Sequence, residues 1–423
     1  MSRVQYFLTP LLCVACGGIG SAGELWEPTE AEIKQAEAGR THLTFREAEV
    51  EPYELPPLLK RADGTVVETA DEWQARRAEL LTLFEEHVYG RLPGPPEEMS
   101  FELLSEDMSA VDGKATRRKY RIDCQSGGRT FDFEFHLVIP NGVDPKKVDS
   151  AVPVFLLISH RSFKEVGRKK PIDDVLWPVD LLIERGYGTA IFVENQLSPD
   201  NRTAFDSGLV ELHPQSDPRP ADGWGGLAAW GWGASRVLDC FEEIDEVDAS
   251  KVAVLGHSRG GKSALWAGAR DDRFGLVISN NSGCGGAALS RRRFGETIAV
   301  ILREDRFPYW FAPKFQDYKD REAGLPIDQH MLLALVAPRP LYVASATEDL
   351  WADPKGEYQA LAHASKVYEL HGHDGLDPER PLRVSDPIQT DRLGHHLRPG
   401  KHDLSRKDWT HYIDFADHLW PKP

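Results

Sequence analysis

The chain has 423 residues, of which 41% are hydrophobic and 28% are charged, and this composition is typical of a globular protein that buries a large core without disulfide staples. Its formal net charge of −17 at pH 7 argues against a nucleic-acid-binding protein, because a phosphate backbone calls for a basic surface. The length fits one large α/β domain with insertions.

The N-terminus has the pattern of a secretory signal peptide over residues 1–22. Arg3 precedes an apolar run, and small residues follow it around Gly20. The run is too short to span a bilayer, so we expect a secreted or periplasmic protein with no membrane span. Anchoring as a lipoprotein through Cys16 is a weaker alternative, because Cys13 stands where a leucine is expected.

The cysteines give little support for a disulfide framework or a metal site. Removal of residues 1–22 leaves Cys124, Cys240 and Cys284, which allow at most one intramolecular disulfide and do not say which. No Cys-x-x-Cys pair or Cys/His cluster survives, so the sequence implies no structural zinc.

Residues 23–100 are expected to form an N-terminal extension that packs on a single catalytic domain over residues 101–423. Within the extension, residues 24–60 are polar and interrupted by prolines, which favours an irregular path over the surface. Residues 70–90 predict a helix that stops at Gly90. Their apolar positions near helical spacing are Trp73, Leu80, Leu83 and Phe84.

The rest of the chain predicts strands that alternate with helices. Two runs of alternating apolar and polar residues, 117–124 and 131–140, predict antiparallel strands. Continuous apolar runs of the parallel-strand type then follow at 152–160, 187–195, 251–258, 274–282, 339–349 and 366–372. Helical stretches at 178–186 and 227–244 separate several of them. We therefore expect an α/β fold with a mainly parallel sheet between two helical layers, and an active site beyond the carboxyl ends of the strands.

The stretch GHSRGG at residues 256–261 matches G-x-S-x-G between a predicted strand and a predicted helix. That context is required of a nucleophile elbow, a sharp turn that exposes a serine hydroxyl at the edge of the sheet. Gly256, Gly260 and Gly261 allow the backbone and the helix to approach closely. We therefore predict that Ser258 is the nucleophile of an α/β-hydrolase, rather than a serine in an ordinary glycine-rich loop.

Arg259 directly follows the serine. The backbone N–H of this position normally forms part of the oxyanion hole, so a guanidinium here could add charged donors to the same oxygen. The alternative is an arginine that turns away to pair with surface acids. The chemistry of the residue leaves both interpretations open.

The acid and the base of a triad are expected later in the chain, in that order. Glu348, Asp349 and Asp353 follow a predicted strand and are candidates for the acid that orients the histidine. The strand after the nucleophile ends near Asn281, which carries no charge.

The histidine is ambiguous from the residues alone. His371 and His373 follow the run at 366–372, whereas His395, His396 and His402 lie further along the chain. Position after an expected strand narrowly favours His373 over His402.

Several stretches together resemble the bacterial glucuronoyl esterases, carbohydrate esterase family 15. They are GHSRGGKSALWAGARD, SNNSGCGGAALSRRRFGET, FPYWF, EDLWADPKGE and RPGKHDLSRKDWTHYIDFADHLW, spread over about residues 150–420. Members of this family are α/β-hydrolases, usually secreted. They hydrolyse the ester between the 6-carboxyl of (4-O-methyl-)glucuronic acid on xylan and alcohols of lignin, so glucuronoxylan and lignin–carbohydrate esters are the expected substrates.

The resemblance implies a role for each matching residue. Ser258 becomes the nucleophile, Arg259 an oxyanion stabiliser, Asp349 the orienting acid and His402 the base, which overrules the preference for His373. The implied substrate-binding residues are Lys262, Glu296 and Trp351, with Glu304 as a weaker match. Some members carry their acid at the position of Asn281, so the acid assignment here rests on Asp349 alone. No metal or cofactor is implied, and we expect a monomer.

Three alternatives remain open: an acetyl xylan esterase, a serine peptidase of similar fold, and a glycan-binding protein without activity. A sugar-acetate enzyme has no evident use for Arg259, Lys262 and Trp351 together. The acidic stretch at residues 195–222 has no periodicity, and we expect it to rim the cleft and contact longer xylan chains.

Overall fold

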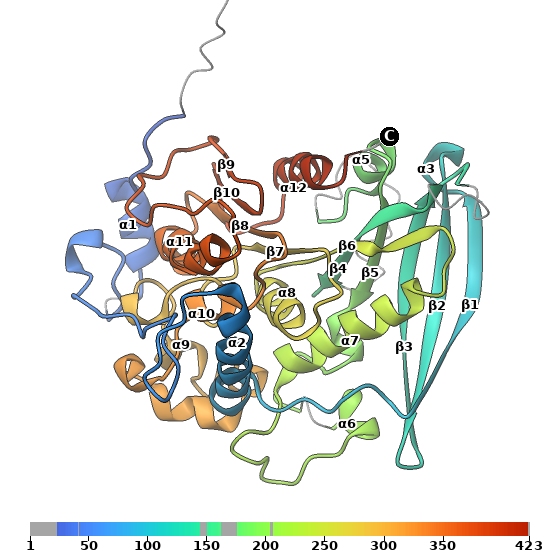
Figure 1. The fold of residues 1–423 in the computed structure, drawn as a ribbon. Coiled ribbons are helices and arrows are strands. Elements are labelled where there is room, and N and C mark those ends of the chain that lie inside the picture. Colours follow the sequence, from blue (N-terminus) through green and yellow to red (C-terminus); the bar gives the residue numbers. More distant parts are fainter. Residues whose placement is uncertain (1–22, 41, 144–149, 162–175, 204–205, 422–423) are drawn as a thin grey trace, which may run out of the picture.

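The computed structural model describes residues 23–40, 42–143, 150–161, 176–203 and 206–421 (Figure 1). The signal peptide predicted for residues 1–22 therefore lies outside the described residues. Across the described ranges, no helix combines the length and the apolar character that a membrane crossing requires.

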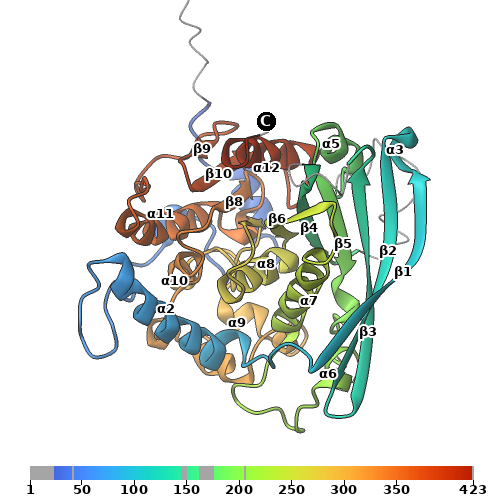
Figure 2. The ribbon, with the colours of Figure 1, turned by 45° about the vertical axis from the view of Figure 1, so that its right-hand side comes forward.

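One sheet organises the described part of the chain. Its ten strands lie in the order β1-β2-β3-β5-β4-β6-β7-β8-β10-β9. Their bounds are β1 Glu98–Ser109, β2 Ala115–Ser126, β3 Arg129–Pro140, β4 Val152–Ser159, β5 Gly188–Val193, β6 Val247–His257, β7 Leu276–Asn280, β8 Leu341–Ala346, β9 Ile388–Gln389 and β10 Leu393–Arg398. The six strands β5, β4, β6, β7, β8 and β10 pair in parallel with their neighbours in this order. The strands β1–β3 form an antiparallel end that Figure 2 shows at the right, and β9 pairs antiparallel with β10. The predicted mainly parallel sheet is confirmed.

Helices cover both faces of the sheet (Figures 1 and 2). One layer contains α2 Ala70–Phe84, α7 Gly226–Phe241, α8 Arg259–Arg270, α10 Gln329–Ala334 and α11 Pro354–Leu370, and the other contains α5 Val179–Glu184 and α12 Arg406–Leu419. Alternate residues of β4 enter different cores: Leu156 packs with the first layer and Leu157 with the second. Both faces of the strand are buried, which explains its continuous apolar sequence. The remaining α-helices of the described residues are α1 Glu30–Glu37, α3 Ala110–Gly113, α6 Leu209–Leu212 and α9 Ile298–Ile301.

In the C-terminal part of the sheet, one predicted strand is wrong and one strand was not predicted. Residues 366–372 are not a strand, because Lys366–Leu370 form the last turns of α11. Buried Leu361, Ala364 and Tyr368 recur at helical spacing, a pattern that is visible only when the run is read together with the preceding residues. The strand in this region is β10, which sequence reasoning missed because two of its buried residues are histidines.

The N-terminal segment is anchored to the main core. Its helix α2 begins at a capping box, in which Thr69 and Glu72 satisfy each other's backbone N–H groups. Trp73, Leu80 and Phe84 are fully buried in the same hydrophobic cluster as the parallel strands. The boundary between an extension at 23–100 and a catalytic domain at 101–423 stays a prediction.

The three cysteines of the described chain are buried and unpaired. Cys124, Cys240 and Cys284 are all free thiols, so none of the possible disulfides among them forms. Burial raises the pKa of the Cys124 thiol to about 12, which keeps it protonated and unreactive at neutral pH.

Candidate active site

Ser258 sits between β6 and α8 in a backbone conformation that few residues adopt. Its φ is 58° and its ψ is −122°, a conformation that costs roughly 1–3 kcal/mol and persists only where the surroundings enforce it. A Cβ on Gly256 would lie 2.1 Å from the carbonyl carbon of Gly260, and one on Gly260 would lie 2.7 Å from the oxygen of Ile158. The glycines of the motif are therefore sterically required, and the turn has the geometry of a nucleophile elbow.

The serine lines a cavity of about 210 Å³ at the carboxyl ends of the strands. Six of the eight predicted site residues line this cavity: Ser258, Arg259, Lys262, Glu296, Trp351 and His402. They come from the elbow and the first turn of α8, from the loop after β7, from the loop after β8 and from the loop after β10. The fold therefore gathers on one surface residues that lie up to about 140 positions apart in the chain.

His402 is held by Asp349. The imidazole Nδ1 lies 2.6 Å from Oδ2 of the carboxylate, whose side chain is only 3% exposed. Burial lowers the pKa of His402, but the hydrogen bond to Asp349 and the charge of that carboxylate outweigh burial, and the net pKa lies above its usual value. Since Nδ1 is committed to Asp349, Nε2 is the nitrogen left for a proton from the serine.

Asn281 supports the acid although it cannot replace it. Its amide Nδ2 donates to Oδ2 of Asp349 at 2.8 Å, the same oxygen that faces the His402 ring. Sequence reasoning treated Asn281 only as a missing acid and missed this donor role. The residue type carried the signal, because an asparagine amide can donate a hydrogen bond to a neighbouring buried carboxylate while that carboxylate stays bonded to the histidine.

Arg259 lies along the cavity wall rather than on the outer surface. Its guanidinium forms an ion pair with Asp200, and its Cζ lies 5.0 Å from the ring centre of Trp310. Asp200 also accepts hydrogen bonds from Trp310 Nε1 at 2.7 Å and from Tyr309 at 3.0 Å. Asp200 belongs to the acidic stretch at 195–222, so that stretch contributes a carboxylate that holds two residues of the cavity lining, Arg259 and Trp310.

A second acid near Arg259 does not neutralise its charge. Glu194 follows β5, is fully buried, and has no hydrogen-bond partner for either carboxylate oxygen among the described residues. Burial raises the pKa of Glu194 to about 8, although the charge of Arg259 acts in the opposite direction. The carboxyl group is therefore mostly protonated at neutral pH and adds no second negative charge beside the Arg259–Asp200 ion pair. Nothing in the sequence signalled this residue.

Lys262 and Glu296 form a loosely paired set of polar groups in the cavity. The Lys262 ammonium donates to the carbonyl oxygens of Ser282 and Cys284 and lies 3.9 Å from Glu296. Burial raises the pKa of Glu296 above its usual value, because its effect outweighs the opposing charges of Lys262 and Arg306. Separations of 3.9 Å leave hydrogen-bonding capacity unused, which suits the binding of sugar hydroxyls.

The indole of Trp351 is fixed at the edge of the cavity by the N-terminal segment. The guanidinium of Arg40 lies 4.9 Å from its ring centre, and Phe45 stacks on it at 6.5 Å. Arg306 lies 5.3 Å from the same ring. The contribution of Arg40 and Phe45 was not predicted, because no local pattern links them to residue 351.

Other candidates from the sequence lie elsewhere. Glu304 is exposed and does not line the cavity. His373 bonds Asp391 at 2.6 Å, which corrects the preference for His373 that spacing alone had given. Asp353 caps α11 and pairs with Arg292 at 2.9 Å, so among these acids it is Asp349 that reaches a cavity histidine.

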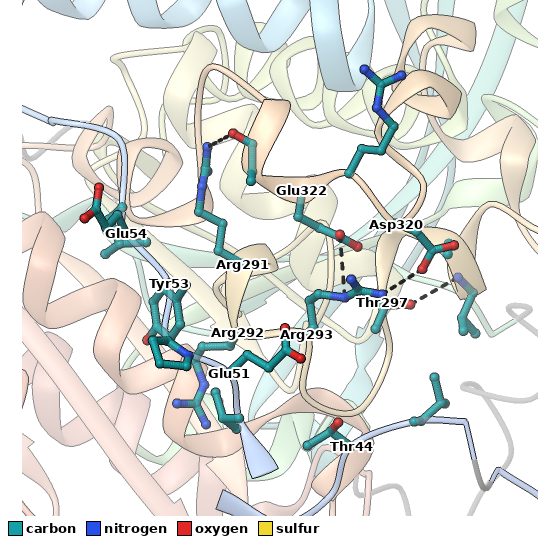
Figure 3. A pocket seen from close by; sticks show the side chains of 18 of the residues that line it. Thr44, Glu51, Tyr53, Glu54, Arg291, Arg292, Arg293, Thr297, Asp320 and Glu322 are labelled. Atoms are coloured by element: carbon teal, nitrogen blue, oxygen red, sulfur yellow. Dashed lines mark hydrogen bonds and ion pairs between the residues drawn. The ribbon is translucent and has the colours of Figure 1, made fainter. Parts of the chain in front are cut away.

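A larger cavity of about 930 Å³ lies between residues 42–57 and residues 291–323 (Figure 3). Two of its arginines are already paired: Arg292 with Asp353 and Glu47, and Arg293 with Asp320 at 2.7 Å. Neither the serine nor His402 lines it. The chemistry therefore points to the smaller cavity as the candidate active site.

Comparisons with known proteins agree on one family. A family model described as glucuronyl esterase, fungi, matches residues 182–372. The chain is 40% identical over 405 residues to carbohydrate esterase MZ0003 from an unknown prokaryotic organism, covering 88% of this chain and 91% of that protein. It is 28% identical over 330 residues to a 4-O-methyl-glucuronoyl methylesterase of Schizophyllum commune, covering 75% of this chain and 74% of that protein.

Solved structures extend the likeness to the fold. A glucuronoyl esterase from Solibacter usitatus matches with a TM-score of 0.81 at 38% identity, covering 89% of this chain and all of that one. A structure described as a promiscuous CE15 esterase from a marine bacterial metagenome matches with a TM-score of 0.78 at 39% identity over 89% of this chain.

Proposed function

Because this chain belongs to carbohydrate esterase family 15, the family of the glucuronoyl esterases, we propose that it hydrolyses the ester between (4-O-methyl-)glucuronic acid of glucuronoxylan and lignin alcohols. The observation that carries the proposal is the shared cavity. It joins a strained serine, a histidine bonded to a buried carboxylate, and the Lys262–Glu296 pair. The first two groups supply acyl transfer, and the third supplies polar contacts for a sugar.

The first half of the reaction transfers the glucuronoyl group to the enzyme. Ser258 Oγ attacks the ester carbonyl carbon while His402 Nε2 takes the hydroxyl proton. The oxyanion is stabilised by the backbone N–H of Arg259 and by its guanidinium. As the carbon–oxygen bond to the alcohol breaks, His402 returns the proton to the leaving oxygen.

The second half releases the acid. Water attacks the acyl carbon, His402 takes a proton from that water, and the bond to Ser258 Oγ breaks as the proton returns to the serine. The charge of Asp349 stabilises the imidazolium that forms twice in the cycle, and Asn281 keeps that carboxylate in place. All of these groups belong to the chain itself.

Substrate recognition follows from the two sides of the cavity. Lys262 and Glu296 bind hydroxyls of the glucuronate ring, and Trp351 offers an apolar edge for the sugar. The cavity is small, so we infer that it receives one sugar unit and that the xylan chain and the alcohol extend outside it.

The test is hydrolysis of benzyl glucuronate by the purified protein, compared with acetyl release from acetylated xylan. The proposal expects turnover of the glucuronate ester and little release of acetate. Efficient deacetylation without turnover of the glucuronate ester would favour an acetyl xylan esterase instead.

We further propose that the protein is a secreted or periplasmic monomer, released by cleavage after a signal peptide at residues 1–22. The substrate is a cell-wall polymer, so the enzyme has to work outside the cytoplasm that makes it. The mass of the mature protein tests cleavage after residue 22. The elution volume of the purified protein in size-exclusion chromatography tests the monomeric state.

A further inference from the structure

The segment that carries His402 is an irregular loop between the end of β10 and the start of α12. The guanidinium of Arg398 lies against the backbone of this loop. Its Nη1 donates to the oxygen of Pro399 at 3.2 Å, and its Nη2 donates to the oxygens of Lys401 at 2.9 Å and Asp403 at 2.5 Å. The loop backbone thus wraps around one cation on both sides of the histidine.

Asp408 holds the two ends of the same loop. This carboxylate is fully buried and accepts from Arg398 Nε at 2.8 Å, and it accepts from the hydroxyl and the backbone N–H of Ser405 at 2.6 and 2.7 Å. Burial raises the pKa of Asp408, but its hydrogen bonds and the neighbouring cationic groups outweigh burial and lower the pKa to about 2. Asp408 is therefore ionised over the working pH range.

A second connection runs from Asp408 to the imidazole ring itself. Asn280 Nδ2 donates to Asp408 at 3.3 Å and to Tyr412 at 2.8 Å, which fixes the amide so that its oxygen faces His257 Nδ1 at 2.6 Å. The ring centre of His257 lies 4.4 Å from that of His402. Burial keeps the pKa of His257 well below its usual value, so a neutral ring supports the catalytic ring.

We propose that Arg398 and Asp408 are positioning residues for His402, acting through the loop backbone and through His257. The inference rests on the proposed function in taking His402 as the base. A guanidinium suits this role because its planar fork presents several donors in fixed directions, whereas an ammonium is a compact point charge. Arg398→Lys therefore keeps a cation beside Asp408 and removes the set of bonds to the loop carbonyls.

The chain offers a matched control at the amino ends of the parallel strands, away from the active site. Arg339 precedes β8 and donates to the backbone oxygens of Gly268, Asp271 and Phe274 and to the carboxylate of Asp272. Arg339→Lys removes the same kind of guanidinium hydrogen bonds to backbone oxygens and leaves the active-site loops unchanged.

The experiment measures kcat and KM on benzyl glucuronate, the rate at which a fluorophosphonate labels the serine, and the melting temperature. For Arg398→Lys we expect kcat and the labelling rate to fall about 10- to 100-fold with KM within about twofold, because misplacing a catalytic group by an ångström has this cost. The acid limb of the rate profile moves to lower pH, since a looser contact with Asp349 removes the main influence that raises the pKa of His402. Arg339→Lys lowers the melting temperature to a similar extent and leaves kcat, labelling and the acid limb unchanged.

The proposal is overturned if Arg398→Lys keeps wild-type kcat and labelling, or if both variants lose activity in proportion to their melting temperatures. If Arg398→Lys does not fold, Ser405→Ala takes its place, with Thr69→Ala as the control because both residues form capping boxes. We then expect kcat to fall a few-fold for Ser405→Ala alone, and equal effects in the two variants overturn the proposal.

Failure of the proposed function gives a different result. A wild-type protein that is labelled by the fluorophosphonate but does not hydrolyse benzyl glucuronate refutes the substrate assignment. The labelling rates of the two arginine variants then decide the positioning role without reference to any substrate. A wild-type protein that is not labelled at all overturns both.

Discussion

The cavity of about 930 Å³ and the cavity of about 210 Å³ differ in size and in the chemical groups that line them. In the cavity of about 930 Å³, ion pairs with carboxylates hold four of the lining arginines: Arg291, Arg292, Arg293 and Arg303. In the cavity of about 210 Å³, Lys262 and Glu296 lie 3.9 Å apart and one nitrogen of His402 is free for a proton. A strained serine beside a histidine that is bonded to a buried carboxylate, rather than volume, marks the site where a reaction can be catalysed.

Both cavities draw on the same stretch of chain. Arg293 and Arg303 line the large cavity, while Glu296 and Arg306 line the small one. Single substitutions in this stretch and in the catalytic loops therefore change one cavity at a time, and their effects on kcat and KM compare the two cavities.

The largest effect is expected from Ser258→Ala. Removing the nucleophile leaves no path to an acyl-enzyme, and kcat on benzyl glucuronate falls by about 10⁴-fold or more. Steady-state rates with the purified variant measure the loss. Retention of turnover would mean that the small cavity is not the catalytic one.

Asp349→Asn comes next, with an expected loss of kcat of about 10³- to 10⁴-fold, because the amide neither fixes the His402 tautomer nor stabilises the imidazolium. The pH profile gives a second readout. His402 must be neutral to act as a base and its pKa is raised, so wild-type activity falls as pH drops through that raised pKa. In the variant, the acid limb lies at lower pH. An unshifted limb would assign the base to another group.

Asp200→Asn tests the support of Arg259, which lines the small cavity. The ion pair with Arg259 is lost, while the volume and an acceptor for Trp310 remain. We expect kcat to fall about tenfold, equivalent to about 1.4 kcal/mol of transition-state stabilisation, because the guanidinium is less well oriented towards the oxyanion. Comparison with Tyr309→Phe, which removes a hydroxyl from the same carboxylate, controls for general loosening.

The smallest effect is expected in the large cavity. Arg293 is 46% exposed, and its ion pair with Asp320 is a surface interaction worth about 0–1 kcal/mol. Arg293→Gln should leave kcat and KM within about twofold of wild type and shift the melting temperature only slightly. A marked rise of KM would show that the large cavity also takes part in substrate binding.

The sequence was sufficient where the determinants are local. The elbow at Ser258 could be predicted because a strand, a tight turn with glycines and a helix are contiguous, and the steric need for Gly256 arises from Gly260, four residues further along the chain. The parallel strands were likewise visible, because burial on both faces makes their sequences continuously apolar.

The sequence was insufficient where residues act across the fold. Position after an expected strand favoured His373, but that strand is the end of α11, and the base candidate in the cavity is His402, which follows the unpredicted strand β10. Histidine letters in β10 look polar, although the strand is buried. Arg40 supports Trp351 from more than three hundred positions away, and no periodicity reports such a contact.

The three buried thiols have a practical consequence. In the described part of the chain the fold depends on no covalent cross-link, since Cys124, Cys240 and Cys284 are all reduced and shielded. Recombinant production therefore needs no oxidative folding machinery, and a reducing agent in storage buffers should neither unfold the enzyme nor slow it.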